Sequence, residues 1–143
     1  MGIHRPRVLI VEDDPDTLVI LRVNLNASGI EPILAGDGRT AIARIQAEDP
    51  DAVLLDVLLP GVDGWEVLEG LHALGDPVPV IICSGKNNPY DIQRARELGA
   101  VAYLVKPFDI DRLVDVTYEA VRAKHQRIVV DQPAPVVEGY ELT

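Results

Sequence analysis

The sequence predicts an α/β protein in which five parallel strands alternate with five helices. Short apolar runs alternate with helical patterns five times along the chain, which is the arrangement of repeated βαβ units. The run 51–56 is apolar on both faces, as in a parallel strand covered by helices on both sides. The 143 residues suit one domain, and only 4% are aromatic, so we expect an aliphatic core. This pattern leaves the order of the strands open.

The first two units are predicted from boundary residues and apolar spacing. The run 8–11 is the first strand, and Pro15 marks the helix after it because proline suits a first helical turn. The second strand is predicted at 30–35. Asp37 can cap a helix over 38–48, because its carboxylate can accept hydrogen bonds from the free backbone N–H groups there.

The other three units follow the same logic. Their strands are predicted at residues 51–56, 80–83 and 101–105. Asp63 and Asp109 can cap the helices that follow the first and the last of these strands. The helix between them is predicted over about 88–98, and Gly99 closes it as a typical glycine just beyond a helix end. The last helix is expected to reach about residue 124.

Composition limits the classes of partner. The formal net charge is −10, which repels nucleic acid phosphates and anionic membrane surfaces, so we expect neither as a direct partner. The single cysteine, Cys83, lies in an apolar run and allows no internal disulfide. Arg5, Pro6 and Arg7 interrupt any secretory apolar region, and no apolar run approaches the roughly 20 residues of a membrane span. We therefore expect a cytoplasmic protein.

The last residues differ from the rest of the chain. Pro133 and Pro135 preclude a regular helix after residue 125, although the apolar run 128–130 could pair with a partner. We therefore divide the chain into one domain at 1–124 and a tail or linker at 125–143.

Four apolar runs each end in a reactive side chain. These side chains are the carboxylates of Glu12, Asp13 and Asp56, the hydroxyl of Ser84 and the ammonium of Lys106. The carboxyl ends of parallel strands meet at the edge of the sheet where ligands bind in open α/β folds. Clustered carboxylates repel one another, and Mg²⁺, which prefers oxygen ligands, relieves that repulsion. The set therefore suits a divalent metal and a phosphoryl group.

Each of these residues also has a simpler interpretation. The acidic stretch 12–16 could serve only in helix capping and in favourable interaction with the helix dipole, and we assign Asp14 and Asp16 to that role. Asp56 alone could initiate a turn, Ser84 alone could cap a loop, and Lys106 alone could be a solvated charge.

Taken together, the motifs closely resemble the receiver domain of bacterial two-component response regulators. The resemblance covers about residues 6–124, and the matching segments occur in order at the family's spacing. They are residues 11–14, 55–64, 82–85, 99–100 and 103–108.

The resemblance implies a flavodoxin-like, doubly wound five-stranded parallel sheet of order 2-1-3-4-5 with five helices. It implies that Asp56 is the phospho-acceptor and that Glu12 and Asp13 hold Mg²⁺ together with Asp56. The backbone carbonyl of Leu58 would be a further metal ligand.

The same resemblance assigns Ser84 and Lys106 to the phosphoryl group. Tyr103 would be the aromatic residue that turns inward when Ser84 moves, and the alternative for it is a half-exposed aromatic on the sheet. Many transcription-factor receivers carry an acidic pair where this chain has Val101 and Ala102, and an acid where it has Arg112. These departures argue against the charged dimer face of that subfamily, and a homodimer stays open.

The expected function is a single-domain switch that accepts a phosphoryl group on Asp56 and changes its affinity for an unknown downstream protein. The donor would be a sensor histidine kinase or a histidine phosphotransfer protein. The chain is not expected to be an enzyme beyond its own phosphoryl transfer and autodephosphorylation. The alternatives are the receiver part of a longer regulator with an output domain, and a pseudo-receiver that only binds.

Overall fold

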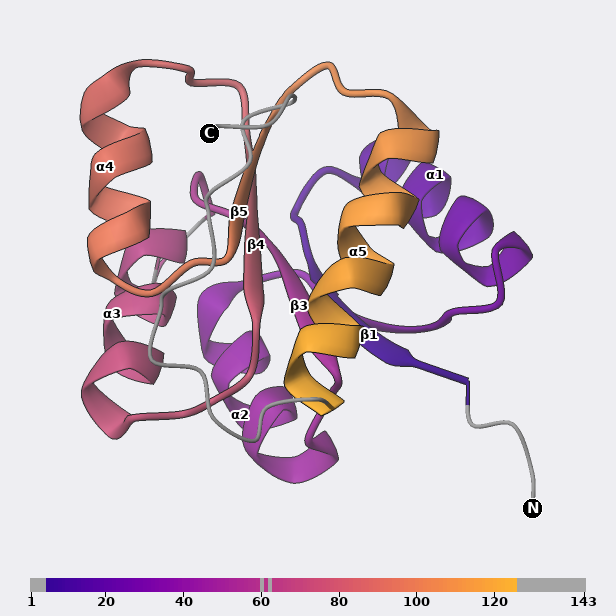
Figure 1. Cartoon of the computed structure of the whole chain (residues 1–143), viewed down its shortest axis with the longest axis horizontal. Coiled ribbons are helices and arrows are strands. Elements are labelled where there is room, and N and C mark those ends of the chain that lie inside the picture. The colour runs from indigo at the N-terminus through magenta and orange to yellow at the C-terminus, as the bar shows by residue number, and fades with distance from the viewer. Residues whose placement is uncertain (1–4, 60, 62, 126–143) are drawn as a thin grey trace.

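The computed structural model describes residues 5–59, 61 and 63–125 as one parallel sheet covered by helices on both faces (Figure 1). The strands are β1 (Arg7–Val11), β2 (Glu31–Ala35), β3 (Ala52–Asp56), β4 (Val80–Ser84) and β5 (Ala102–Val105). The helices are α1 (Pro15–Ala27), α2 (Gly38–Glu48), α3 (Gly64–Leu74), α4 (Pro89–Glu97) and α5 (Ile110–His125). The sheet order is β2-β1-β3-β4-β5 with every pair parallel, which confirms the expected doubly wound topology.

The sheet separates two hydrophobic clusters. Helices α1 and α5 cover one face, and α2, α3 and α4 cover the other (Figure 1). Along β1, Val8 and Ile10 belong to the cluster under α1 and α5, whereas Leu9 and Val11 belong to the opposite cluster. Successive strand side chains point to opposite faces, so a strand covered on both sides must be apolar at every position. The continuous apolar runs of the sequence follow from this burial.

Side-chain caps set where several helices begin. Asp37 accepts a hydrogen bond from the backbone N–H of Thr40, and Asp63 accepts one from Glu66, as predicted. Gly99 adopts φ of 90°, the left-handed conformation expected of a glycine that ends a helix. For each strand, the predicted and observed bounds agree at one end and differ by one residue at the other. For example, β2 begins at Glu31 because the backbone of Ile30 closes the turn after α1.

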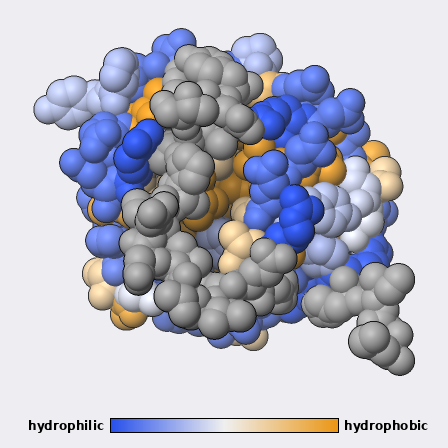
Figure 2. Space-filling view, in the orientation of Figure 1, coloured by the Kyte–Doolittle hydropathy of each residue, from blue (hydrophilic) through white to orange (hydrophobic). Residues whose placement is uncertain are grey.

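The surface of the described part is largely hydrophilic. The face in Figure 2 is mostly blue, and hydrophobic residues show between the polar ones. Among the described helices, none has the length and apolar character needed to cross a membrane. The predicted tail at 125–143 lies outside the described residues except for His125, the last residue of α5.

Candidate functional site

The carboxyl edge of the sheet brings the predicted residues together because of the strand order. β1 lies between β2 and β3, with Val11 opposite Leu55, so the residues after β1 lie beside the end of β3. β4 and β5 are also neighbours, and the backbone N–H of Lys106 donates to the carbonyl of Ser84 at 2.7 Å. Residues from four parts of the sequence therefore meet at one edge.

Three carboxylates form a cluster at this edge. Glu12, Asp13 and Asp56 each offer an oxygen, and these oxygens lie within 4.8 Å of one another. Glu12 is only 3% exposed and Asp56 only 7%, whereas Asp13 is exposed to solvent. Mg²⁺ prefers a small number of carboxylates and keeps several waters, so one exposed and two buried acids fit its coordination. The donor set matches the metal expected from the sequence.

Lys106 bridges the two buried acids. Its Nζ lies 2.7 Å from Glu12 Oε1 and 3.1 Å from Asp56 Oδ2, and its side chain is 27% exposed. Burial disfavours the ammonium, but hydrogen bonds and attraction to the two carboxylates outweigh this effect, so the pKa of Lys106 is raised. Lys106 is therefore a half-buried, charged donor in two ion pairs, and the alternative of a plain solvated lysine is wrong.

The buried position of Glu12 disfavours the ionised form of its carboxyl group. Burial raises the pKa of Glu12, although the hydrogen bond from Lys106 opposes the shift. The nearby carboxylate of Asp56 raises it further. Any cation that enters the cluster would favour the ionised form of Glu12.

Asp56 is fixed on both oxygens. Its Oδ1 accepts a hydrogen bond from the backbone N–H of Leu58 at 2.9 Å, and its Oδ2 faces Lys106. The first turn of α3 packs directly behind it, because a Cβ added at Gly64 would lie 2.3 Å from the Asp56 carbonyl oxygen. The close approach of Gly64 was not foreseen from the sequence, where the only signal was a glycine directly after a helix cap.

Ser84 and Tyr103 are linked through the loop after β4. Ser84 is fully buried, and its Oγ accepts a hydrogen bond from the backbone N–H of Lys86 at 3.1 Å. Tyr103 is also fully buried, and its hydroxyl donates to the carbonyl of Lys86 at 2.8 Å. The alternative of a half-exposed Tyr103 is therefore wrong, and Lys86 joins the two residues through its backbone.

Asp14 and Asp16 serve at the start of α1 and are not part of the acidic cluster. Asp14 caps α1 and accepts a hydrogen bond from the backbone N–H of Thr17 at 3.2 Å, and hydrogen bonds from Thr17 lower the pKa of Asp14. Asp16 lies in the first turn of the same helix, where an acid favours the helix dipole. The Leu58 carbonyl as a metal ligand stays a prediction.

The family model of the response regulator receiver domain matches residues 8–118. Among curated relatives, the chain is 41% identical over 113 residues to the transcriptional regulatory protein PrrA of Mycobacterium tuberculosis. That alignment covers 79% of this chain and 48% of PrrA. The chain is 35% identical over 137 residues to the DNA-binding response regulator MtrA of Mycolicibacterium smegmatis, covering 96% of this chain and 58% of MtrA. The chain thus spans about half the length of these relatives.

Solved structures show the same fold. The signal receiver domain of a putative Luxo repressor protein from Vibrio parahaemolyticus has a TM-score of 0.83 and 26% identity, covering 90% of this chain and 99% of that one. A CheY-like receiver domain protein from Methanospirillum hungatei has a TM-score of 0.81 and 27% identity, covering 87% and 99%.

Proposed function

The chain belongs to the response regulator receiver domain family, and from that membership we propose that it is a switch controlled by phosphorylation of Asp56. The observation that supports this most is the position of Asp56, which lies within the acidic cluster while Lys106 contacts its Oδ2. The donor would be a phosphohistidine on a sensor kinase or a histidine phosphotransfer protein. Such a reaction would take place in the cytoplasm.

The proposed step is a phosphoryl transfer. An Asp56 oxygen attacks phosphorus, the bond from phosphorus to the donor nitrogen breaks, and an aspartyl-phosphate forms. Such transfers depend mainly on positioning and on neutralising charge. The Leu58 N–H holds one oxygen of the nucleophile, and Lys106 supplies positive charge to the other side. Mg²⁺, held by Glu12, Asp13 and Asp56, would offset negative charge on the transferred group.

The output would be a change of surface rather than a reaction on a second substrate. Ser84 would move toward the phosphoryl group, and this movement would hold Tyr103, which is already buried in this structure, in its inward position through the backbone of Lys86, to which both residues bond. The face formed by α4, β5 and α5 would then change its affinity for a downstream protein, as a shift between two populated states. The chain is proposed as a switch and not as an enzyme with its own substrate.

A second form of this function has its own support. Because the chain spans about half of PrrA and of MtrA, it could act as the receiver part of a longer regulator. PrrA is named a transcriptional regulatory protein and MtrA a DNA-binding response regulator. In that case the proposed downstream partner is an output domain.

The test is chemical phosphorylation followed by intact-protein mass. Acetyl phosphate with Mg²⁺ should add one phosphate to the protein, and chelating the metal should prevent it. Asp56→Asn should remove the adduct, whereas Asp115→Asn, at an exposed position on α5, should keep it. Asp13→Ala should also reduce the adduct sharply because it removes one carboxylate of the cluster. Full phosphorylation of the Asp56→Asn protein would contradict the assignment.

A further inference from the structure

Helix α1 is apolar on its outer side as well as on the side that faces the sheet. Leu21 and Leu25 are buried in the cluster under the helix. Val19, Ile20 and Val23 instead expose 48%, 52% and 53% of their surface. Six large apolar side chains are exposed among the described residues, and these three are the only ones that share an element. Single exposed apolar residues are ordinary, but three together on one helix form a patch that suits an interaction.

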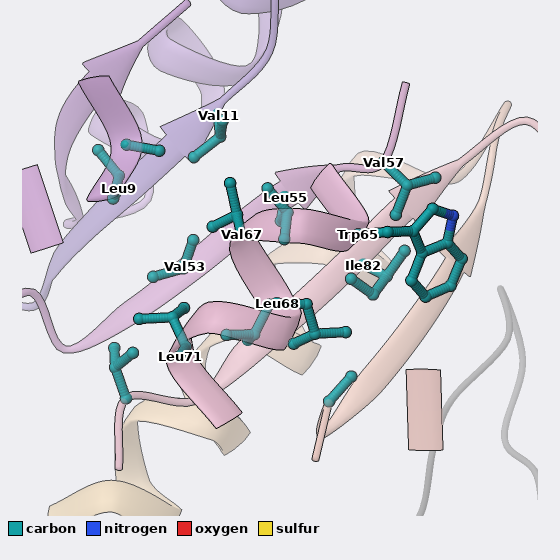
Figure 3. Close-up of a cluster of buried hydrophobic side chains, with 14 of the residues drawn as sticks. Leu9, Val11, Val53, Leu55, Val57, Trp65, Val67, Leu68, Leu71 and Ile82 are labelled. Atoms are coloured by element: carbon teal, nitrogen blue, oxygen red, sulfur yellow. The ribbon is translucent and has the colours of Figure 1, made fainter. Parts of the chain in front are cut away.

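Helix α3 shows the ordinary arrangement for comparison. Figure 3 shows Val67, Leu68 and Leu71 of α3 in one apolar cluster with residues of the strands that the helix covers. Within the described part of α3, the large apolar residue that is exposed is Leu74, at its last position. A helix that lies on a sheet needs only one apolar stripe, so packing on the sheet does not explain the outer apolar residues of α1.

The outer residues of α1 do not favour the helix itself either. Val19, Ile20 and Val23 are β-branched, and such side chains lose rotamer freedom in a helix. Alanine, lysine or glutamate would stabilise an exposed helical position better. Neither the core nor the helix accounts for these three residues, which favours a role in contact with another molecule.

The exposed residues of α1 have the spacing of a helix that pairs with another helix. Asp16, Ile20, Val23 and Ala27 are all exposed and follow one another at steps of four, three and four residues, with Val19 beside them. Steps of three and four residues place side chains along one side of a helix, as in the seam of a coiled coil. We call these five residues the outer stripe, which is about 16 Å long at the helical rise per residue.

The two ends of the outer stripe carry opposite charges. Asp16 lies at its start, in the first turn of α1. At its other end lies the exposed Arg5, whose Nη2 donates to Asn26 Oδ1 at 3.0 Å. A second α1 helix that ran in the opposite direction would place the negative end of each stripe beside the positive end of the other. The same arrangement would place Ile20 beside Val23, at the centre of the contact.

We infer that the outer stripe of α1 is the surface through which two copies of this chain associate as an antiparallel pair. Ile20 of each copy lies against Val23 of the other, and Asp16 of each copy lies near Arg5 of the other. This contact is self-complementary, as a two-fold interface requires. Because few residues contribute from each copy, the interface is small, and we expect micromolar or weaker affinity. The inference does not depend on phosphorylation of Asp56.

The test measures self-association of the full chain by sedimentation equilibrium. Physiological ionic strength screens the repulsion between two copies that each carry a net charge of −10. Wild type should form a reversible dimer. Val23→Lys and Ile20→Lys should each weaken association about tenfold or more, because they place a charge at the centre of the apolar contact.

Leu74→Lys is the matched control for these variants. It also replaces an exposed apolar helical residue by lysine and changes the net charge equally, but it lies at the end of α3. This variant should associate as wild type does. Every protein in the comparison keeps residues 126–143, so any contribution of that segment is the same in all of them.

Disulfide cross-linking tests the direction of the pair. Asp16→Cys and Ala27→Cys should cross-link when the two variants are mixed and oxidised, because an antiparallel pair brings these positions together. Each variant alone should cross-link poorly, since its two introduced thiols lie about one stripe length apart, too far for a disulfide. The native Cys83 does not compete, because it is buried and its thiol pKa is raised to about 12.

Each part of the test has a result that would overturn the inference. Wild type that stays monomeric at millimolar concentration would show that the outer stripe serves a partner other than a second copy. Dimerisation of Val23→Lys and Ile20→Lys equal to that of wild type would show that the copies associate through another surface. Efficient cross-linking of Asp16→Cys with itself would show that the helices pair in parallel, against the match of charges.

Discussion

Leu58 exposes 55% of its surface two residues after Asp56. The backbone N–H of Leu58 donates a hydrogen bond to the Asp56 carboxylate. Its aliphatic side chain offers no group that could orient a water molecule. Lys86 occupies the position two after Ser84 and is also exposed. The two side chains flank the expected route of a hydrolytic water.

The aspartyl-phosphate should therefore be long-lived, and Leu58→Asn should hydrolyse several-fold faster because an amide can position water. The measurement is the loss of the phosphate adduct over time by intact mass. Leu74→Asn is the control, since Leu74 is 68% exposed at the end of α3. Equal decay of wild type and Leu58→Asn would show that water access is not set by this side chain.

Cys83 illustrates how burial controls reactivity at the residue scale. It is 3% exposed on β4, and burial raises the pKa of its thiol to about 12. At pH 8 the thiolate fraction is then about 10⁻⁴, and the thiolate is the form that reacts.

Alkylation of the folded protein by iodoacetamide at pH 8 should therefore be very slow, and denaturation should make it rapid. Since Cys83 is the only cysteine, the labelled mass reports it alone. The rate should increase as the pH rises, because deprotonation requires a pH near the raised pKa. Rapid labelling of the folded protein at pH 8 would contradict the buried position.

At the scale of elements, the start of α3 depends on a missing side chain. A Cβ at Gly64 would lie 2.3 Å from the Asp56 oxygen and 2.4 Å from the Val57 Cα, and both of these atoms belong to the backbone. Backbone atoms cannot move aside as the end of a flexible side chain can. A side chain at residue 64 would therefore displace the start of α3 from β3. Gly70 lies in the same helix, and a Cβ there would have no atom within 4 Å.

Gly64→Ala should therefore lower the free energy of unfolding by about 1–3 kcal/mol and reduce phosphorylation, because it displaces Asp56. Gly70→Ala should instead raise it by about 0.5–1 kcal/mol, since alanine favours a helix over glycine. Urea denaturation of both variants gives the two free energies. A Gly64→Ala protein as stable as Gly70→Ala would contradict the close packing of α3 on β3.

At the scale of the whole molecule, the described domain contains both hydrophobic clusters within residues 8–121. From the apolar run 128–130, followed by Pro133 and Pro135, we predict an arm that binds a partner surface rather than a further core layer, and the alternative is a plain linker.

Deleting residues 126–143 should therefore leave the melting temperature nearly unchanged, because the two clusters remain complete. Any self-association seen by light scattering should weaken. A calorimetric scan of the shortened and full chains makes the comparison. A large fall in melting temperature would show that these residues stabilise the domain, and the arm interpretation would then be wrong.

Much of this fold could be predicted from the sequence because its causes are local. Continuous apolar runs identified the buried parallel strands, and Asp37, Asp63 and Gly99 marked helix ends through their capping chemistry. The reactive residues could be placed at one edge because each follows a strand. The strand order came from resemblance to a family, since the pattern alone leaves it open.

What only the tertiary structure decided depends on contacts between distant segments. Lys106 bridges Glu12 and Asp56, which lie 94 and 50 residues away in the chain, because the order β1-β3-β4-β5 brings their strands together. The approach of Gly64 to Asp56 and the stacking of Arg94 on Trp65 likewise arise from how helices pack on the sheet. Local propensity and periodicity specify an element and its buried face, but not which side chain of another element lies opposite. That choice is made by packing, and here it determines the environment of Asp56.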